Sequence, residues 1–338
     1  HPTSSAASDV YKRQNQYWLK VLQARSEDKK EAVPFSLGPL VATDSTWRSE
    51  ISIRELNQCL SNPARYFFEN RWHTYFSHPH SNTEDDEPLV LDGLSRYQLV
   101  QELLHQDHYE YKRFVLDGRL PIGNLANEAA NELNNISGKL LKQAKAHYPD
   151  LDLSAIPSKQ DVEWEVPNLL VSGRIDGIYQ LGTRNLYVAW RPGRLRANDR
   201  IHLWLRWLLL QASDKNMSID EACFIAIDKV LVLPKLDKQV AVEQLQNILK
   251  FWQKTLLEPV PFFPETAWSW VSSEDKNKAL KAYLGSDFPG APRAEIDDPH
   301  FYRTCPDLKE QFDSFAKNAE LLLGPLYRLE MATEEGGK

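Results

Sequence analysis

The side chains best placed to do chemistry lie in two neighbouring segments, residues 171–179 and 186–193. The first segment carries Asp176, and the second carries Ala189-Trp190-Arg191. Two carboxylates on adjacent strands can hold a divalent metal ion, and a lysine beside them can orient or activate the water that attacks a phosphodiester. In this sequence, however, the second segment contains neither a carboxylate nor a lysine, and it carries Ala189 and Arg191 instead.

Asp176 alone is a poor metal site. Mg²⁺ needs carboxylate charge to stay bound, whereas Arg191 adds a fixed positive charge at the metal position. We therefore expect no metal ion, no cofactor and no catalytic residue in these segments. The structural role that we expect for Asp176 is a salt bridge across the strands, either to Arg191 or to Arg174.

A basic run follows, with arginines at four positions of the segment 191–200. They are Arg191, Arg194, Arg196 and Arg200. This segment forms the end of a predicted strand and the start of a predicted helix, beside the position where an active nuclease would hold DNA. We interpret the run as a DNA-binding or partner-binding edge, with a solvated loop as the alternative.

Other candidate groups have structural interpretations. His73, His78 and His80 have a spacing that a transition metal could use, but their segment has the composition of an exposed loop. Cys59 is expected to be a small buried hydrophobe, because the sequence places no histidine to activate it. No GxxxxGK[ST], GxGxxG or GxSxG motif occurs, so ATP binding and serine hydrolysis have no support.

Hydrophobic periodicity and capping signals predict the elements that position these groups. Ser52 and Glu55 form a capping box that opens a helix, and Pro63 starts a second helix. Strict alternation predicts a strand at 161–166 with one solvated face. The remaining predictions are helices at 94–114, 125–147, 198–212 and 237–257, strands at 169–179, 185–191 and 222–227, a helical region after the connector 259–264, and a frayed polar tail after Met331.

These elements predict an α/β fold. Residues 115–235 form a nuclease-like core with the order helix-strand-strand-strand-helix-strand, a degenerate version of the restriction-endonuclease-like PD-(D/E)xK arrangement, with helices added before and after it. The other predicted ranges are a disordered leader at 1–14, a linker at 15–50, a helical subregion at 51–114 and a helical C-terminal extension at 236–338.

The core segments resemble the nuclease domain of the RecB and AddB family, whose motifs read G-x-x-x-H, G-x-x-D, D-Y-K and Q-x-x-x-Y. The residues at these positions are Gly123 with Asn127, Gly173 with Asp176, Ala189-Trp190-Arg191, and His202 with Arg206. Among the usual metal-binding residues only Asp176 is kept. The resemblance therefore implies a nuclease fold without its active site.

Most of the chain is also similar to the RecC family, the gamma subunits of exodeoxyribonuclease V. The matching segments are Asn62–Phe68 for the motif P-x-R-x-F-F, Leu91–Gln98, Gly118–Pro121, Trp190–Pro192 and Gly324–Tyr327. The resemblance implies a non-catalytic C-terminal domain that holds RecB and RecD together in a hetero-trimer. It also implies that this domain guides or splits duplex and forked DNA in double-strand-break repair by homologous recombination, while ATP hydrolysis and strand cleavage belong to the partners.

Composition narrows the possible classes of protein. The net charge of −7 argues against an isolated domain that binds nucleic acid by bulk positive charge. No apolar stretch has the length of a membrane-spanning helix. Three cysteines without a CxxC pair indicate neither a disulfide framework nor a zinc ribbon, so we expect a reducing, cytoplasmic location.

Two other functions are compatible with parts of the sequence. One is an active Mg²⁺-dependent DNA exonuclease with a migrated site, in which Glu163 or Glu165 joins Asp176 and Arg191 replaces the lysine. Arginine is effectively never deprotonated in proteins and cannot act as a base, which disfavours this alternative. The other is a small DNA-binding domain that acts alone, which the acidic net charge disfavours.

Overall fold

The computed structural model describes residues 39–41, 48–76, 91–104, 111–213, 218–285 and 294–336. The strands are β1 (Glu50–Ser52), β2 (Ser158–Val166), β3 (Leu169–Leu181), β4 (Arg184–Trp190), β5 (Glu221–Ile225) and β6 (Val230–Pro234). The helices are α2 (Ile53–Ser61), α3 (Pro63–Arg71), α4 (Gly93–Leu104), α5 (Tyr111–Leu116), α6 (Asn124–His147), α7 (Ala197–Ala212), α8 (Lys238–Thr255), α9 (Pro264–Ser273), α10 (Lys276–Leu284), the 3-10 helix η2 (Glu295–Asp297), α11 (Pro299–Thr304) and α12 (Leu308–Gly336).

The described strands form one mixed six-stranded sheet in the order β1-β3-β4-β5-β6, with β2 paired to β3. β3 runs antiparallel to β2 and β4, β4 runs parallel to β5, and β5 runs antiparallel to β6. The α/β class is confirmed, and so is the predicted order of helix, three strands, helix and strand, which runs from α6 to β5. The short strands β1 and β6 were not predicted.

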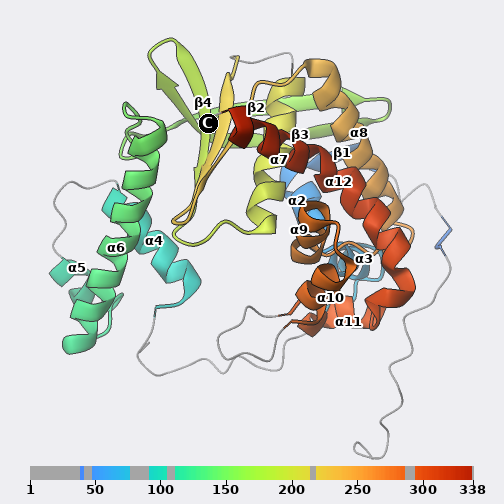
Figure 1. Cartoon of the computed structure of the whole chain (residues 1–338), viewed down its shortest axis with the longest axis horizontal. Coiled ribbons are helices and arrows are strands. Elements are labelled where there is room, and N and C mark those ends of the chain that lie inside the picture. Colours follow the sequence, from blue (N-terminus) through green and yellow to red (C-terminus); the bar gives the residue numbers. More distant parts are fainter. Residues whose placement is uncertain are drawn as a thin grey trace, which may run out of the picture.

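Helices cover both faces of the central strands (Figure 1). On one face, Tyr187 of β4 and Phe224 of β5 belong to a core with α2, α7 and α8. On the other face, Leu186 and Cys223 belong to a core with α4 and α6. Central strands buried on both sides need apolar residues at every position, which explains the continuous apolar run of β5.

The strand β2 keeps one solvated face. Val162 and Trp164 are buried, while Glu163 and Glu165 between them are exposed, as the strict alternation predicts. This strand pairs only with β3 in the described sheet, so its charged residues lie on the outer surface beside the first half of β3.

The predicted helix starts are confirmed for α2 and α3. The Ser52 hydroxyl accepts from the Glu55 amide at 3.2 Å, and the Glu55 carboxylate accepts from the Ser52 amide at 3.1 Å, which completes the capping box. The Asn62 side chain accepts from the Arg65 amide at 2.9 Å, and Pro63 occupies the first turn of α3. Of the helix predicted at 94–114, the structure describes α4 up to Leu104 and α5 from Tyr111, and residues 105–110 lie outside the described residues.

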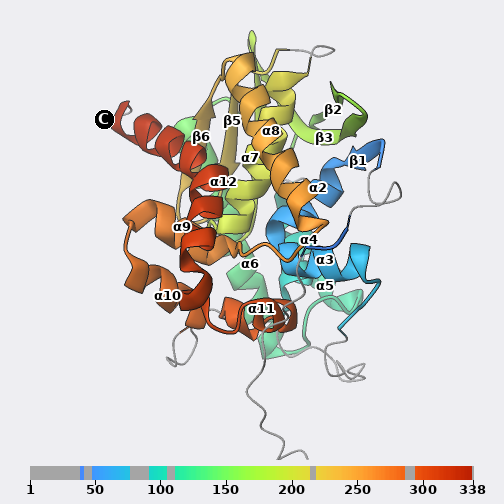
Figure 2. The same cartoon turned by 90° about the vertical axis from the view of Figure 1, so that its right-hand side faces the viewer.

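The helix α7 lies between the sheet and α8 (Figure 2). It is apolar on most of its circumference, and Leu203, Leu205 and Trp207 are fully buried. A helix packed on all sides needs this composition, because it has almost no solvent-facing stripe. Its partly exposed residues include His202 and Arg206, and both line a cavity with the middle of β3 and the end of β4.

The C-terminal helices pack on the same side of the sheet as α7 and α8 (Figure 2). The predicted long helix is confirmed as α8, with the Asp237 side chain accepting from the Gln239 amide at 2.7 Å. The prediction of a frayed tail after Met331 is wrong, because α12 continues to Gly336 and its Glu334 carboxylate contacts Lys229 at 2.8 Å. Among the described helices, none is apolar over a length that could cross a bilayer.

One hydrophobic core takes residues from all three predicted structured ranges. Ile51, Trp204 and Leu326 belong to the same cluster of buried side chains, although they come from the predicted helical subregion, core and C-terminal extension. These parts of the chain therefore pack on one another through a shared apolar interior.

Candidate functional site

A cavity of about 600 Å³ opens where β3 and β4 meet α4 and α7. We call it the β3–β4 pocket. The residues at nuclease-motif positions that line it are Asp176, Ala189, Arg191, His202 and Arg206. The fold thus brings together side chains that are widely separated in the sequence, whereas Asn127 is exposed on α6 and does not line the pocket.

Gly177 shapes the floor of this pocket. Its φ is +95°, and a Cβ at this position would lie 2.5 Å from the carbonyl oxygen of Val188. Only glycine allows β3 to pass so close to β4 in that conformation. The pairing of β3 with β4 begins one residue later at Ile178, so Asp176 stands at the point where the two strands separate.

Asp176 lies at the pocket rim and is mostly exposed. Its carboxylate contacts Lys159 of β2 at 3.7 Å. The prediction of a salt bridge to Arg191 or Arg174 is wrong, because Arg174 pairs with Asp161 at 2.6 Å. The reason is register: β2 places Lys159 and Asp161 directly opposite Asp176 and Arg174.

Arg191 joins the end of β4 to the start of α7. Its guanidinium contacts the Asp199 carboxylate at 2.8 Å, and the same carboxylate oxygen accepts from the Arg196 amide at 2.9 Å. An acidic side chain in the first turn of a helix stabilises its N-terminus. Arg191 therefore balances the charge of an aspartate of α7.

The arginines of the basic run have different environments. Arg194 and Arg196 are exposed, and Arg196 also lines the β3–β4 pocket. Arg200 is only 7% exposed, forms two hydrogen bonds with Glu330 at 3.1 and 3.2 Å, and lies 4.1 Å above the ring of Trp268. These contacts leave Arg200 no surface for a phosphate, so the expected DNA contact of this residue is corrected to a structural one.

Aromatic residues form one wall of the pocket. Tyr97 of α4 stacks on Trp190 of β4, with ring centroids 5.0 Å apart and planes 15° from parallel. Arg96 of α4 also lines the pocket and contacts Glu132 at 3.2 Å. The site predictions missed α4, although the segment Leu91–Gln98 that carries both residues was among the segments shared with the RecC family.

Burial sets the protonation of the deepest groups. It raises the pKa of Tyr187 to about 12, and the nearby Arg206 guanidinium opposes part of that rise. Burial, followed by the charge of Arg206, lowers the pKa of His202 to about 4. His202 is therefore neutral at pH 7, and its Nε2 lies 3.0 Å from the Ser61 hydroxyl.

The residues of this pocket do not fit a catalytic metal ion. Asp176 and Asp199 are its lining carboxylates, and each is already in an ion pair. Glu163 is opposite Ser172 on β3, about 13 Å along the strand from Asp176, and neither Glu163 nor Glu165 lines the pocket. Within the described residues, no group of three or more His, Cys, Asp or Glu side chains could hold a metal ion.

The isolated candidates behave as structural residues where they are described. Cys59, Cys223 and Cys305 are buried free thiols, and burial raises the pKa of Cys59 to about 12, which confirms the prediction of a buried hydrophobe. His73 is exposed, whereas His78 and His80 lie outside the described residues.

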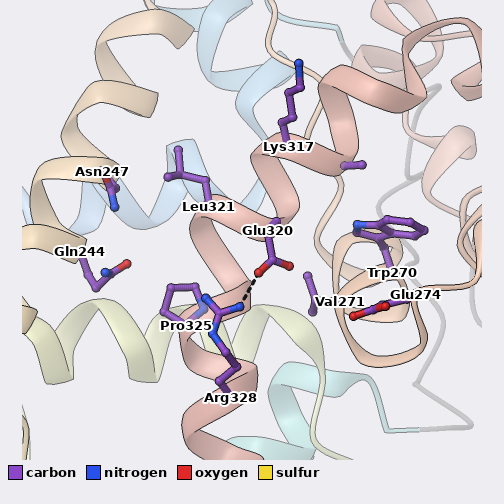
Figure 3. A pocket seen from close by; sticks show the side chains of 11 residues that line it. Gln244, Asn247, Trp270, Val271, Glu274, Lys317, Glu320, Leu321, Pro325 and Arg328 are labelled. Atoms are coloured by element: carbon purple, nitrogen blue, oxygen red, sulfur yellow. Dashed lines mark hydrogen bonds and ion pairs between the residues drawn. The ribbon is translucent and has the colours of Figure 1, made fainter.

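A second cavity of about 720 Å³ lies between α8, α9 and α12 (Figure 3). Trp270, Val271 and Leu321 give it apolar walls, and the Glu320–Arg328 ion pair lies at its edge. It shares no lining residue with the β3–β4 pocket and contains no residue that the sequence predicted to be functional.

Comparisons with known proteins match most of the chain. It is 24% identical over 311 residues to the RecBCD enzyme subunit RecC of Escherichia coli strain K12, which covers 83% of this chain and 26% of that protein. It is 23% identical over 278 residues to RecBCD enzyme subunit RecC of Haemophilus influenzae, which covers 76% of this chain and 23% of that protein. The chain thus spans about a quarter of the length of these curated relatives.

A solved structure described as SSO0001 aligns with 62% of this chain and 78% of that chain, at 12% sequence identity. Its TM-score of 0.24 is too low to indicate a shared fold. The family model named RecC C-terminal domain matches residues 48–275, which span β1 to α9 and include every residue named for the β3–β4 pocket. On this match the chain belongs to the RecC C-terminal domain family.

Proposed function

We propose that this chain is the non-catalytic C-terminal domain of a RecC subunit in a RecBCD-type helicase and nuclease complex. In that complex it scaffolds the partner subunits RecB and RecD and guides or splits duplex DNA during double-strand-break repair. The core around β3, β4 and α7 is, in this proposal, a nuclease-like PD-(D/E)xK core that has lost its chemistry. Family membership and the curated relatives support the setting.

The composition of the β3–β4 pocket carries the non-catalytic part of the proposal. A metal-dependent nuclease needs at least two carboxylates free to bind the ion. Here Ala189 removes one, Asp176 faces Lys159, and Arg191 holds Asp199. The alternative of a migrated site has no support from this geometry, because Glu163 and Glu165 lie outside the pocket.

The DNA-guiding part rests on the exposed basic edge. Arg194 and Arg196 are exposed in the segment that follows β4, and Arg196 lines the pocket, near where a nuclease of this fold would pass its DNA strand. Guanidinium groups contact phosphates without reading sequence. The acidic net charge of the chain implies that such contacts are local and act together with those of the partners.

Assembly and DNA binding can be tested with one set of preparations. The purified chain should co-purify with separately expressed RecB and RecD, and the complex should bind forked DNA more tightly than the chain alone. Changing Arg194 and Arg196 together to Glu should lower the affinity of the assembled complex for forked DNA at least tenfold and reduce the salt dependence of binding.

A matched control is a charge reversal of two exposed basic residues far from the pocket, Lys276→Glu with Lys278→Glu on α10. This control should leave DNA affinity within about twofold of the unmodified complex, because screening weakens charges beyond the Debye length. Failure of the chain to capture either partner, or equal affinities for the Arg194/Arg196 variant and the control, would contradict the proposal.

A further inference from the structure

The β3–β4 pocket contains arginine donors that no described group satisfies. Arg191 and Arg96 each use one terminal nitrogen for a carboxylate, Asp199 and Glu132 respectively. The Nε–H group of each arginine is buried and has no hydrogen-bond partner among the described residues. Arg196 and Arg206 line the same cavity, so four guanidinium groups border it and make it a candidate site for a hydrogen-bond acceptor.

The charge of the cavity identifies the sign of that acceptor. Four arginines and two aspartates line it, and His202 is neutral at pH 7. Both aspartates are engaged by cations, Asp176 by Lys159 and Asp199 by Arg191. Arg206 lies beside the neutral Tyr187 hydroxyl, and no carboxylate of the described chain is within salt-bridge distance of it. The acceptor is therefore an anion.

The aromatic wall identifies its chemical class. The Tyr97–Trp190 stack lines the cavity together with the arginines, and Tyr97 is 37% exposed. Nucleobases stack on aromatic side chains, and arginine forks match the oxygens of phosphate. A carboxylate ligand would use the arginines but would leave the aromatic stack without a role. The cavity volume of about 600 Å³ is within the range of pockets that hold a nucleotide.

We propose that the β3–β4 pocket binds one nucleotide of a DNA strand, with its phosphate on Arg191 and Arg206 and its base against the Tyr97–Trp190 stack, and that it does so without a metal ion. This inference rests on the proposed function, because DNA is the source of the nucleotide. The former catalytic position thereby becomes a holding site: the phosphate is bound where a nuclease would cleave it.

The test uses the full chain and a single-stranded dodecamer that carries a 5′ phosphate and a 3′ fluorescein, with affinity measured by fluorescence anisotropy. Arg206→Gln should weaken binding about tenfold and lower the slope of log affinity against log salt by about one. Trp190→Leu should weaken binding severalfold with the salt slope unchanged. The affinities should be equal in EDTA and in Mg²⁺.

Arg174→Gln is the matched control, because Arg174 is an exposed arginine on β3 that lies outside the pocket. It should bind as the unmodified chain does. Arg206→Lys keeps the charge but loses the planar fork, so it should give an intermediate affinity and provides a second variant should Arg206→Gln not fold.

The ligand sources are distinguished by two further arms, a dodecamer with a 5′ hydroxyl and free deoxyadenosine monophosphate as competitor. Equal binding of both dodecamers indicates an internal phosphodiester. Weaker binding of the hydroxyl form indicates a strand terminus, and competition at low concentration indicates a free nucleotide. Each of these results supports a phosphate site.

Unchanged affinity and salt slope in Arg206→Gln and Trp190→Leu would overturn the inference. If the Arg194/Arg196 variant lost DNA affinity in the same experiment, the proposed contact of these two arginines with DNA would remain supported. Failure of the unmodified chain to capture RecB or RecD would instead count against the proposed function.

Discussion

Arg191 shows how one side chain changes what a pocket can hold. A lysine at the end of β4 could lose its proton and activate water, whereas arginine stays charged and presents a planar fork of donors. The Arg191 fork holds Asp199 at 2.8 Å and leaves Nε directed at no described acceptor. In the proposed nuclease-like core, arginine at this position therefore supplies no base and offers hydrogen-bond donors to an anion.

His202 gives a prediction about pH. Burial and the charge of Arg206 lower its pKa to about 4, so the folded protein holds it neutral, while the unfolded chain protonates it near its ordinary value of about 6.5. The stabilisation is therefore fully present above pH 6.5 and is lost as the pH falls toward 4. Over that window the unmodified chain should lose up to about 3 kcal/mol of unfolding free energy relative to His202→Gln.

Urea unfolding of both proteins between pH 7 and pH 4 measures this difference. The contributions of the other titrating groups to the free energy of unfolding are the same in both proteins and therefore cancel. His147→Gln is the control, since that histidine is exposed at the end of α6 and should give curves parallel to the unmodified chain. A constant difference between His202→Gln and the unmodified chain across the range would contradict the buried, neutral histidine.

Some residue contacts could not be predicted from the sequence. Of the positions that the family resemblance pointed to, Asp176, Ala189, Arg191, His202 and Arg206 line one pocket, whereas Asn127 lies apart on α6. The partners of Asp176 and Arg174 depend on the register between β2 and β3. The alternating polarity of the two strands does not show which residue of one strand lies opposite which residue of the other. Burial of Arg200 depends on α12, whose Glu330 is 130 residues away.

At the scale of elements, local signals predicted most of the fold. The capping box of α2, the period of α6 and the apolar composition of α7 are each contained in their own segments. The strand β1 has only three residues and forms by parallel pairing with β3. Three residues are too few to show an alternating pattern, so the sequence does not predict this strand. The strand β6 is five residues long and ends in Pro234, which resembles a turn in the sequence.

The contact between α7 and α12 gives a prediction about stability. Arg200 and Glu330 are both buried, and Lys229 contacts the same carboxylate at 2.6 Å. Removing one partner of a buried pair leaves an uncompensated charge, although Lys229 still offsets part of it. Arg200→Met should therefore lower the free energy of unfolding by about 3 kcal/mol.

Arg328→Met is the matched control, because the Arg328–Glu320 pair on the same helix is exposed on both sides. Exposed pairs contribute little, so this variant should lie within about 1 kcal/mol of the unmodified chain in urea unfolding. Equal free energies of unfolding for the two variants would contradict a stabilising role of the Arg200–Glu330 pair.

For the whole molecule, the pocket is a product of chain segments far apart in sequence. α4 supplies the aromatic and basic wall, β3 and β4 supply the floor, and α7 supplies His202 and Arg206. The helices α8, α9 and α12 share one continuous hydrophobic core with α7. The C-terminal helices therefore help to fix the helix that borders the pocket, and their substitutions should affect DNA binding only through stability.

The most direct test of the central claim is a cleavage assay of the purified full chain on labelled forked DNA with 10-fold increments of Mg²⁺ or Mn²⁺, beside its Asp176→Ala variant. A pocket with Ala189 and Arg191 in place of the second carboxylate and the lysine predicts that both proteins bind DNA and that neither cleaves it at any metal concentration. Metal-dependent cleavage by the chain alone that disappears in Asp176→Ala would contradict this, because it would require an active nuclease site around Asp176.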